Sequence, residues 1–185
     1  MCGRVVQVSD PIKLSIVDGL NVRDPSGGRK PINAKSETVA RLPTFRDAYQ
    51  RRRCILPVDA FYEWRATKGR KQPYAIAMKD RSPFGIAGIW ESWKNPKGEW
   101  VRTFAILTTP ANELVATIHD RMPAILAPGN YDRWIGVELD PRDLLQPFPL
   151  DLMVIWPIST RVNSPANDDK HLLDEIESAE DPAGV

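Results

Sequence analysis

The stretch Arg53-Cys-Ile-Leu-Pro-Val-Asp-Ala-Phe-Tyr-Glu-Trp64 opens a series of short apolar or alternating segments that decides the fold of this chain. Segments of this length and pattern are typical of β-strands. We expect strands at 54–58, 61–65, 73–79, 84–91 and 100–108. Turn-forming residues at 68–69, 80–83 and 95–98 separate these segments, which predicts hairpins.

Shorter elements surround this series on both sides. The pattern predicts further strands at 5–6 and 153–156, and a loop at 24–31. Helices are expected at 10–18, 45–52, 109–118, 129–135 and 142–146. Neither a repeat nor an internal linker interrupts the sequence, so we expect an α+β single domain over residues 1–163. A polar C-terminal tail over 164–185 is expected to fray.

Length, charge and cysteine content narrow the class of protein. A chain of 185 residues that is 42% hydrophobic can bury one sizeable core. A net charge of +1 does not by itself indicate a polyanion partner. A nucleic-acid site would therefore be a local basic patch, such as 51–53 or 65–71. Cys2 and Cys54 make neither a disulfide framework nor a zinc site, and no metal or cofactor is expected. Without an apolar run or a signal sequence, we expect a cytoplasmic protein with no membrane contact.

Cys2 is the most informative position in the chain. Removal of Met1 would leave an α-amine and a thiol on adjacent carbons, and both titrate near pH 8. This 1,2-aminothiol condenses with an aldehyde, first to an imine and then to a five-membered thiazolidine. The alternative interpretation is that a cysteine follows the initiator methionine by accident.

Three further polar residues are candidates for chemistry, each with a structural alternative. Glu63 lies between aromatic residues, where burial would raise its pKa and suit it to proton transfer, or it lies on an exposed alternating face. His119 follows a predicted helix, where it either is catalytic or is satisfied by a carbonyl group. Asn33 either positions a ligand oxygen or belongs to a turn before Ser36, a possible helix N-cap.

Four motifs occur together in one order: Met1-Cys-Gly-Arg4, Asn33-Ala-Lys-Ser-Glu-Thr38, the stretch 53–64, and Ile118-His-Asp-Arg-Met-Pro-Ala-Ile-Leu126. In this arrangement the chain resembles the SOS-response-associated peptidase family. The resemblance covers most of 1–8 and 31–163. It implies a mixed, barrel-like β-sheet core with peripheral helices. It also implies a protein that traps abasic sites in single-stranded DNA as a covalent crosslink. We expect this protein to be a monomer and to be associated with the nucleoid when bound to DNA.

The resemblance further implies roles for individual residues. Cys2 would form the thiazolidine, Asn33 would orient the reactants, Glu63 would shuttle protons, and His119 would assist ring opening and reversal. Five matching positions would line the DNA path: Arg4, Lys35, Trp64, Thr108 and Arg121. Lys35 departs from the arginine usual in the family and loses the bidentate fork to phosphate. The segment between Cys2 and Asn33 is shorter than usual and lacks two aromatic elements of the family.

Two other classes of function stay open at this point. An N-terminal cysteine with a histidine and an asparagine is also compatible with a thiol hydrolase or peptidase, and the crosslinking class itself is compatible with lyase activity. A non-covalent DNA-binding module would need only a stacking aromatic such as Trp64 and scattered arginines.

Overall fold

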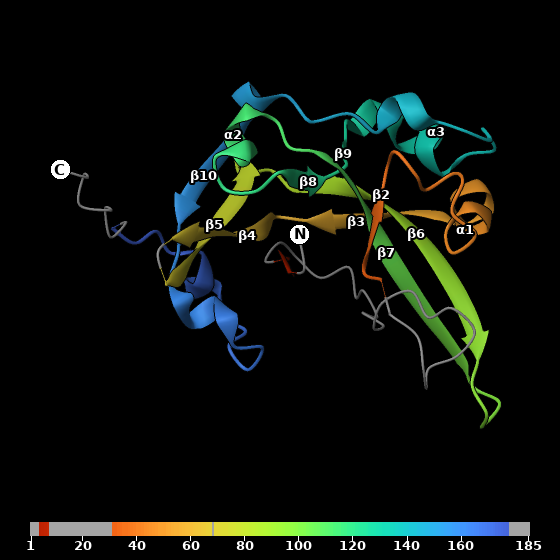
Figure 1. The fold of residues 1–185 in the computed structure, drawn as a ribbon, viewed down its shortest axis with the longest axis horizontal. Helices are drawn as coiled ribbons and strands as arrows, with labels where there is room; N and C mark the ends of the chain where they lie inside the picture. The colour runs from red at the N-terminus through yellow and green to blue at the C-terminus, as the bar shows by residue number, and fades with distance from the viewer. Residues whose placement is uncertain (1–3, 8–30, 68, 178–185) are drawn as a thin grey trace.

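The computed structural model describes residues 4–7, 31–67 and 69–177. It shows two β-sheets side by side, with short helices around them (Figure 1). The smaller sheet has the strand order β1-β4-β5-β10, with β1 (Val5–Val6), β4 (Ala60–Thr67), β5 (Arg70–Met78) and β10 (Met153–Pro157). The larger has the order β2-β7-β6-β3, with β2 (Asn33–Lys35), β7 (Trp100–Pro110), β6 (Phe84–Lys94) and β3 (Arg53–Val58). Two further strands extend the larger sheet, β8 (Arg121–Pro123) beside β7 and β9 (Ile125–Leu126) beside β6.

The five expected strands between 54 and 108 are confirmed, as are those at 5–6 and 153–156. Two of the three expected hairpins are also confirmed, β4–β5 and β6–β7. Gly69 and Gly98 in their turns have φ of 81° and 85°, a backbone conformation that favours glycine. Because β2 runs parallel to β7 while the other pairs are antiparallel, the larger sheet is mixed.

The third expected hairpin, at 80–83, is wrong. This turn joins β5 to β6, which lie in different sheets, because both edges of β5 are already occupied by β4 and β10. The turn itself forms as expected, since Oδ1 of Asp80 accepts hydrogen bonds from the backbone N–H and the hydroxyl of Ser82.

The helices are short and lie at the periphery. They are α1 (Arg46–Arg51), α2 (Glu113–Ala116) and α3 (Tyr131–Ile135), with 3₁₀ helices η1 (Pro128–Asn130), η2 (Arg142–Leu144), η3 (Leu150–Leu152), η4 (Thr160–Asn163) and η5 (Lys170–Leu173). These confirm helical structure within 45–52, 129–135 and 142–146. The expected helix at 10–18 and most of the loop at 24–31 lie outside the described residues.

The helix expected at 109–118 begins later than its sequence suggests. Thr109 and Pro110 still belong to β7, where they pair with Met122 and Arg121 of β8. The N-cap of α2 is instead Asn112, whose Oδ1 accepts a hydrogen bond from the backbone N–H of Val115 at 2.9 Å. Pairing with β8, a strand that the sequence pattern did not predict, therefore keeps residues 109 and 110 extended.

The core between the two sheets gives the body its barrel-like form. Phe61 and Ile76 of the smaller sheet pack in one buried cluster with Ile86 and Ile106 of the larger sheet. A second cluster lies on the other face of the larger sheet, beneath α1 and α3. Burial of each such large apolar side chain contributes about 1.5–3 kcal/mol. The expected fold class, an α+β domain with a mixed barrel-like core and peripheral helices, is confirmed.

The described part of the expected polar tail packs on the smaller sheet. Leu172 of η5 is buried, and the indole N–H of Trp156 donates a hydrogen bond to the carbonyl of Leu173 at 2.8 Å. The boundary at residue 163 stays a prediction, while the chain has contacts that a frayed end lacks as far as Ile176, whose backbone N–H donates to the carbonyl of Pro157 at 3.1 Å. Among the described helices, none has the length and apolar character needed to cross a membrane.

Candidate functional site

Glu63 is a buried carboxyl group in the middle of β4. Its residue is 1% exposed, and it lies opposite Tyr74 of β5 with Tyr62 and Trp64 on either side. Burial raises the pKa of Glu63, and the neighbouring charge of His119 opposes part of that rise. The interpretation of Glu63 as an exposed position is therefore wrong. A carboxyl group with a raised pKa can both donate and accept a proton near neutral pH.

His119 reaches the same region from the turn after α2. Its backbone N–H donates to the carbonyl of Val115 at 2.9 Å, which closes the helix. Its Nδ1 lies 3.0 Å from the backbone nitrogen of Arg121 and 2.9 Å from Oδ1 of Asp120. The first contact requires an unprotonated Nδ1 and the second a protonated one, so the ring has a partner in either state.

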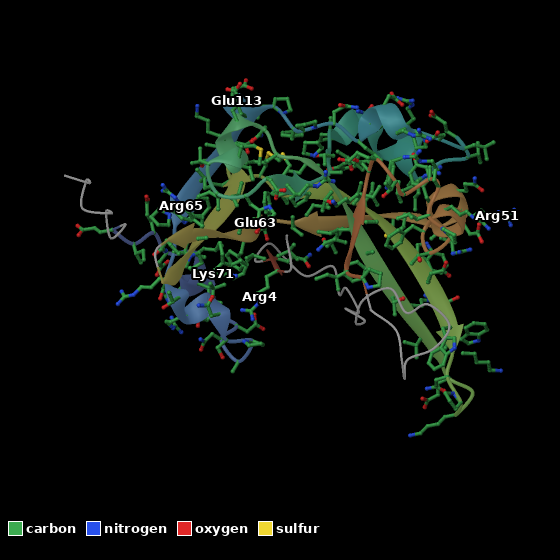
Figure 2. All side chains as sticks on the ribbon, viewed as in Figure 1. Arg4, Arg51, Glu63, Arg65, Lys71 and Glu113 are labelled. Carbon is green, nitrogen blue, oxygen red and sulfur yellow. The ribbon has the colours of Figure 1, made fainter. Side chains whose placement is uncertain are left out.

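These two residues line a pocket of about 410 Å³ together with Trp64, Lys71 and Asn163. Asn163 of η4 organises the wall of the pocket. Its Oδ1 accepts a hydrogen bond from the indole N–H of Trp64 at 2.7 Å, and its backbone carbonyl accepts one from the guanidinium of Arg4 at 3.0 Å. Figure 2 shows Arg4, Glu63 and Lys71 in the same part of the molecule, around β1 and β4. The structure thus brings Glu63, His119 and Trp64 together, and connects Arg4 to them through Asn163.

Asn33 lies on β2, in the larger sheet, and is not part of the pocket wall. It is in register with Ile106 of β7, and it belongs to a strand rather than to a turn. Both polar atoms of its side chain are buried and have no hydrogen-bond partner among the described residues. Leaving a buried polar group unsatisfied costs about 1–3 kcal/mol, so a ligand that pairs with Asn33 would recover that free energy.

The second cluster of expected site residues surrounds Arg121. Its guanidinium forms a bidentate ion pair with Glu37 and also donates to the carbonyl and hydroxyl of Thr108. Thr108 is 1% exposed and is in register with Lys35, which is exposed at the end of β2. Arg121 and Thr108 therefore fix the end of β2, while Lys35 is the member of this cluster that presents an exposed cation.

The ion pair makes a prediction for acid stability. The Arg121 guanidinium lowers the pKa of Glu37 to about 2, whereas an unfolded glutamate titrates near 4.3. Above about pH 4.3 the pair stabilises the folded state, and this contribution is lost as the pH falls through about 2. Because the Glu37 side chain is 47% exposed, we expect Glu37→Gln to lower the free energy of unfolding at pH 7 by only about 1 kcal/mol. Urea unfolding of both proteins from pH 7 to pH 3 should show this difference shrinking with acid; a difference independent of pH would contradict it.

Cys54, the other cysteine, is structural. It lies on β3 in register with Gly88, and burial raises the pKa of its thiol to about 11. A Cβ atom added to Gly88 would lie 2.9 Å from the Cys54 sulfur, so the two residues pack closely. Because the thiolate is the nucleophilic form, Cys54 is poorly suited to attack at neutral pH.

Cys2 lies outside the described residues. Within the residues that are described, no group of side chains could hold a metal ion.

Sequence reasoning missed Asn163 and Glu37 as parts of the site. Asn163 has no local signal, because its importance comes from contacts with Trp64 and Arg4, which are 99 and 159 residues away. Glu37 belongs to the quoted motif 33–38, but only the fold shows that it neutralises Arg121. Lys71 falls within the basic stretch 65–71, which sequence analysis singled out as a possible patch.

A family model for the SOS response associated peptidase (SRAP) matches residues 16–165. The chain belongs to this family, which confirms the resemblance. Its relatives include the abasic site processing protein YoqW of Bacillus subtilis (strain 168), 40% identical over 157 residues that make up 82% of this chain and 70% of YoqW. The abasic site processing protein HMCES of Gallus gallus is 32% identical over 178 residues, which cover 83% of this chain and 53% of that protein.

Solved structures agree with the family assignment. A crystal structure of a protein from Bacteroides thetaiotaomicron superposes with a TM-score of 0.73 at 33% identity, covering 78% of this chain and 66% of that one. A protein from Bordetella bronchiseptica gives a TM-score of 0.64 at 37% identity, covering 69% and 64% of the two chains. The chain thus spans about two thirds of these solved proteins and about half of the chicken relative.

Proposed function

We propose that this protein processes abasic sites in DNA, and that it does so by forming a thiazolidine between Cys2 and the abasic sugar in a single strand. The names of the relatives support abasic-site processing. The observation that carries the covalent mechanism is the pocket in which the buried carboxyl of Glu63 and the imidazole of His119 lie next to β1.

Chain connectivity supports the assignment of Cys2 as the nucleophile. The carbonyl of Arg4 accepts the backbone N–H of Tyr62 at 3.1 Å, so the chain enters β1 beside the residue that precedes Glu63. The two residue steps from Cys2 to Arg4 span at most about 7 Å. The nucleophile of the proposed reaction is therefore tethered to the strand that carries the proposed acid–base group.

The proposed reaction needs proton transfers but no cofactor. Loss of Met1 frees the α-amine of Cys2, which adds to the aldehyde carbon of the ring-opened sugar. The resulting hydroxyl leaves as water, with its proton supplied by Glu63, and an imine forms. The thiolate then adds to the imine carbon, and the imine nitrogen takes up a proton to give the ring amine. Glu63 suits both transfers, and His119 would assist sugar ring opening and reversal.

The remaining site residues are assigned to binding. Arg4, Lys35 and Trp64 would contact the strand directly, while Thr108 and Arg121 would act by holding the end of β2. Asn33 would orient the opened sugar, because its unsatisfied amide can pair with a sugar hydroxyl. We further propose that the protein acts as a monomer in the cytoplasm and is associated with the nucleoid when bound to DNA.

A denaturing gel tests the proposed function. The protein is incubated with a single-stranded oligonucleotide carrying one abasic site, and with an undamaged oligonucleotide as the control. We expect a band that survives denaturation with the abasic strand alone. Turnover of peptide substrates without such a band would favour a thiol hydrolase, and a complex that dissociates on denaturation would favour a non-covalent binding module.

A further inference from the structure

The β6–β7 hairpin extends well beyond the body of the larger sheet (Figure 1). In its outer part Trp90, Ser92 and Lys94 are directly opposite Phe104, Arg102 and Trp100. Side chains that are opposite each other, or two apart along a strand, lie on the same face of a sheet. These six residues form one face of the hairpin, here called the hairpin face.

The hairpin face continues along the larger sheet to the face that carries Asn33 and Thr108. Two steps further along β7, Ile106 lies on this face and is in register with Asn33 of β2, and Thr108 is in register with Lys35. The opposite face carries Ile89 and Ala105, which pack in the core beneath α1 and α3. Helices thus cover one side of the sheet, while the hairpin face continues from Asn33 toward the hairpin turn.

The outer part of this face is exposed, aromatic and positively charged, whereas Trp90 and Phe104, nearer the body, are half-buried. Trp100 is 68% exposed, and Ser92, Lys94 and Arg102 are exposed as well, whereas Trp93 and Val101 on the opposite face are half-buried. Within the described residues, no carboxylate pairs with Lys94 or Arg102. The two nearby acids have other partners: Glu91 is paired with Arg52, and Glu99 accepts from the side chain of Asn95 at 2.8 Å.

We propose that the hairpin face binds the stretch of single-stranded DNA that flanks the processed site, an inference that rests on the function proposed above. Trp100 provides a platform on which a base stacks, and Lys94 and Arg102 contact phosphates. An exposed aromatic ring next to two cations, Lys94 across the strand pair and Arg102 two residues along β7, matches the bases and charges of a single strand. The six residue steps from Ile106 to Trp100 span about 20 Å. A single strand whose bases were stacked about 3.4 Å apart, as in B-DNA, would cover that distance in about six nucleotides.

The test compares binding of two labelled strands that carry an unreactive tetrahydrofuran abasic analogue at the centre. The short strand has two nucleotides on each side of the analogue, and the long strand has ten. Fluorescence anisotropy should show that Trp100→Ala binds the long strand roughly tenfold more weakly than the parent protein does, because one base no longer stacks. Its affinity for the short strand should be unchanged, and Trp100→Phe should retain most of the affinity for the long strand.

The salt dependence tests the two cations. In Lys94→Ala/Arg102→Ala, the slope of log affinity against log salt for the long strand should become shallower by about 1.4, or about 0.7 for each phosphate that the variant no longer neutralises. Arg46→Ala is the matched control, because Arg46 is exposed on α1, which packs on the opposite face of the larger sheet from the hairpin face. This variant should keep the slope of the parent protein.

Equal affinities of Trp100→Ala and the parent for the long strand would overturn the inference. So would a change in the oligomeric state of Trp100→Ala in size-exclusion chromatography, because the face would then bind a second copy of the chain. The proposed function is tested separately by capture of a short strand with a natural abasic site. If that capture fails while Trp100→Ala still weakens binding of the long strand, the hairpin inference stands without the crosslinking mechanism.

Discussion

Cys2→Ala should abolish the covalent complex with an abasic oligonucleotide. Alanine retains the α-amine and can form an imine, but it has no thiol to close the ring. A reversible imine alone does not survive denaturation without a reductant. The measurement is the fraction of oligonucleotide shifted on a denaturing gel, where we expect capture by the parent protein and none by the variant.

Cys54→Ser is the matched control for this experiment. Burial raises the pKa of the Cys54 thiol to about 11, so the parent residue contributes little thiolate at neutral pH. We expect the variant to capture at the rate of the parent protein. Cys2→Ser should leave at most a slow, reversible adduct, because a hydroxyl is a much poorer nucleophile for ring closure. Full capture by Cys2→Ala would mean that another residue forms the bond.

Glu63→Gln should slow crosslinking by about 10²–10⁴-fold, the usual contribution of a general acid–base group. Glutamine keeps the size and polarity of the side chain but cannot exchange a proton, so DNA binding should change little. Single-turnover rates and anisotropy on the same oligonucleotide separate these two effects.

We expect His119→Ala to slow both formation and reversal of the crosslink. Unchanged rates in both Glu63→Gln and His119→Ala would assign these two residues a purely structural role.

Glu63→Gln should slow crosslinking but stabilise the folded protein, so a stability measurement distinguishes lost chemistry from misfolding. Because burial raises the pKa of Glu63, the folded state binds more protons than the unfolded state above about pH 4.3. This contribution of Glu63 to stability therefore falls as the pH rises through its raised pKa. Glutamine does not ionise, so the melting temperature of Glu63→Gln should increase relative to that of the parent between pH 4.5 and pH 8. A relative decrease would contradict the burial of an ionisable group at this position.

Most strands of this fold could be predicted from local sequence, but strand partners could be predicted only within hairpins. Alternation of apolar residues and the turns at Gly69 and Gly98 predict the β4–β5 and β6–β7 hairpins, because such pairing is local. The turn at 80–83 has the same kind of sequence and yet connects two sheets, because β10, about 75 residues later, takes the other edge of β5. The strands β2, β8 and β9 have two or three residues each, too few to show a period.

The candidate site, like the fold, could be predicted only in part from the sequence. Glu63 and His119 could be identified from their neighbours and from the family motifs, and the structure places both in one pocket. The ion pair between Arg121 and Glu37 could not be identified in this way, because the two residues are 84 positions apart in the sequence. Arg121, which the resemblance assigns to the DNA path, also fixes the end of β2 through its contacts with Glu37 and Thr108.

Mass spectrometric mapping of the crosslinked peptide tests the central claim most directly. The protein is allowed to react with an abasic oligonucleotide, the complex is digested with a protease and a nuclease, and the modified residue is sequenced. We expect the adduct on an N-terminal peptide that begins at Cys2, without Met1, and with the mass of the sugar fragment less one water. An adduct on Cys54 or on a lysine, or full reactivity of a protein that retains Met1, would contradict the thiazolidine mechanism.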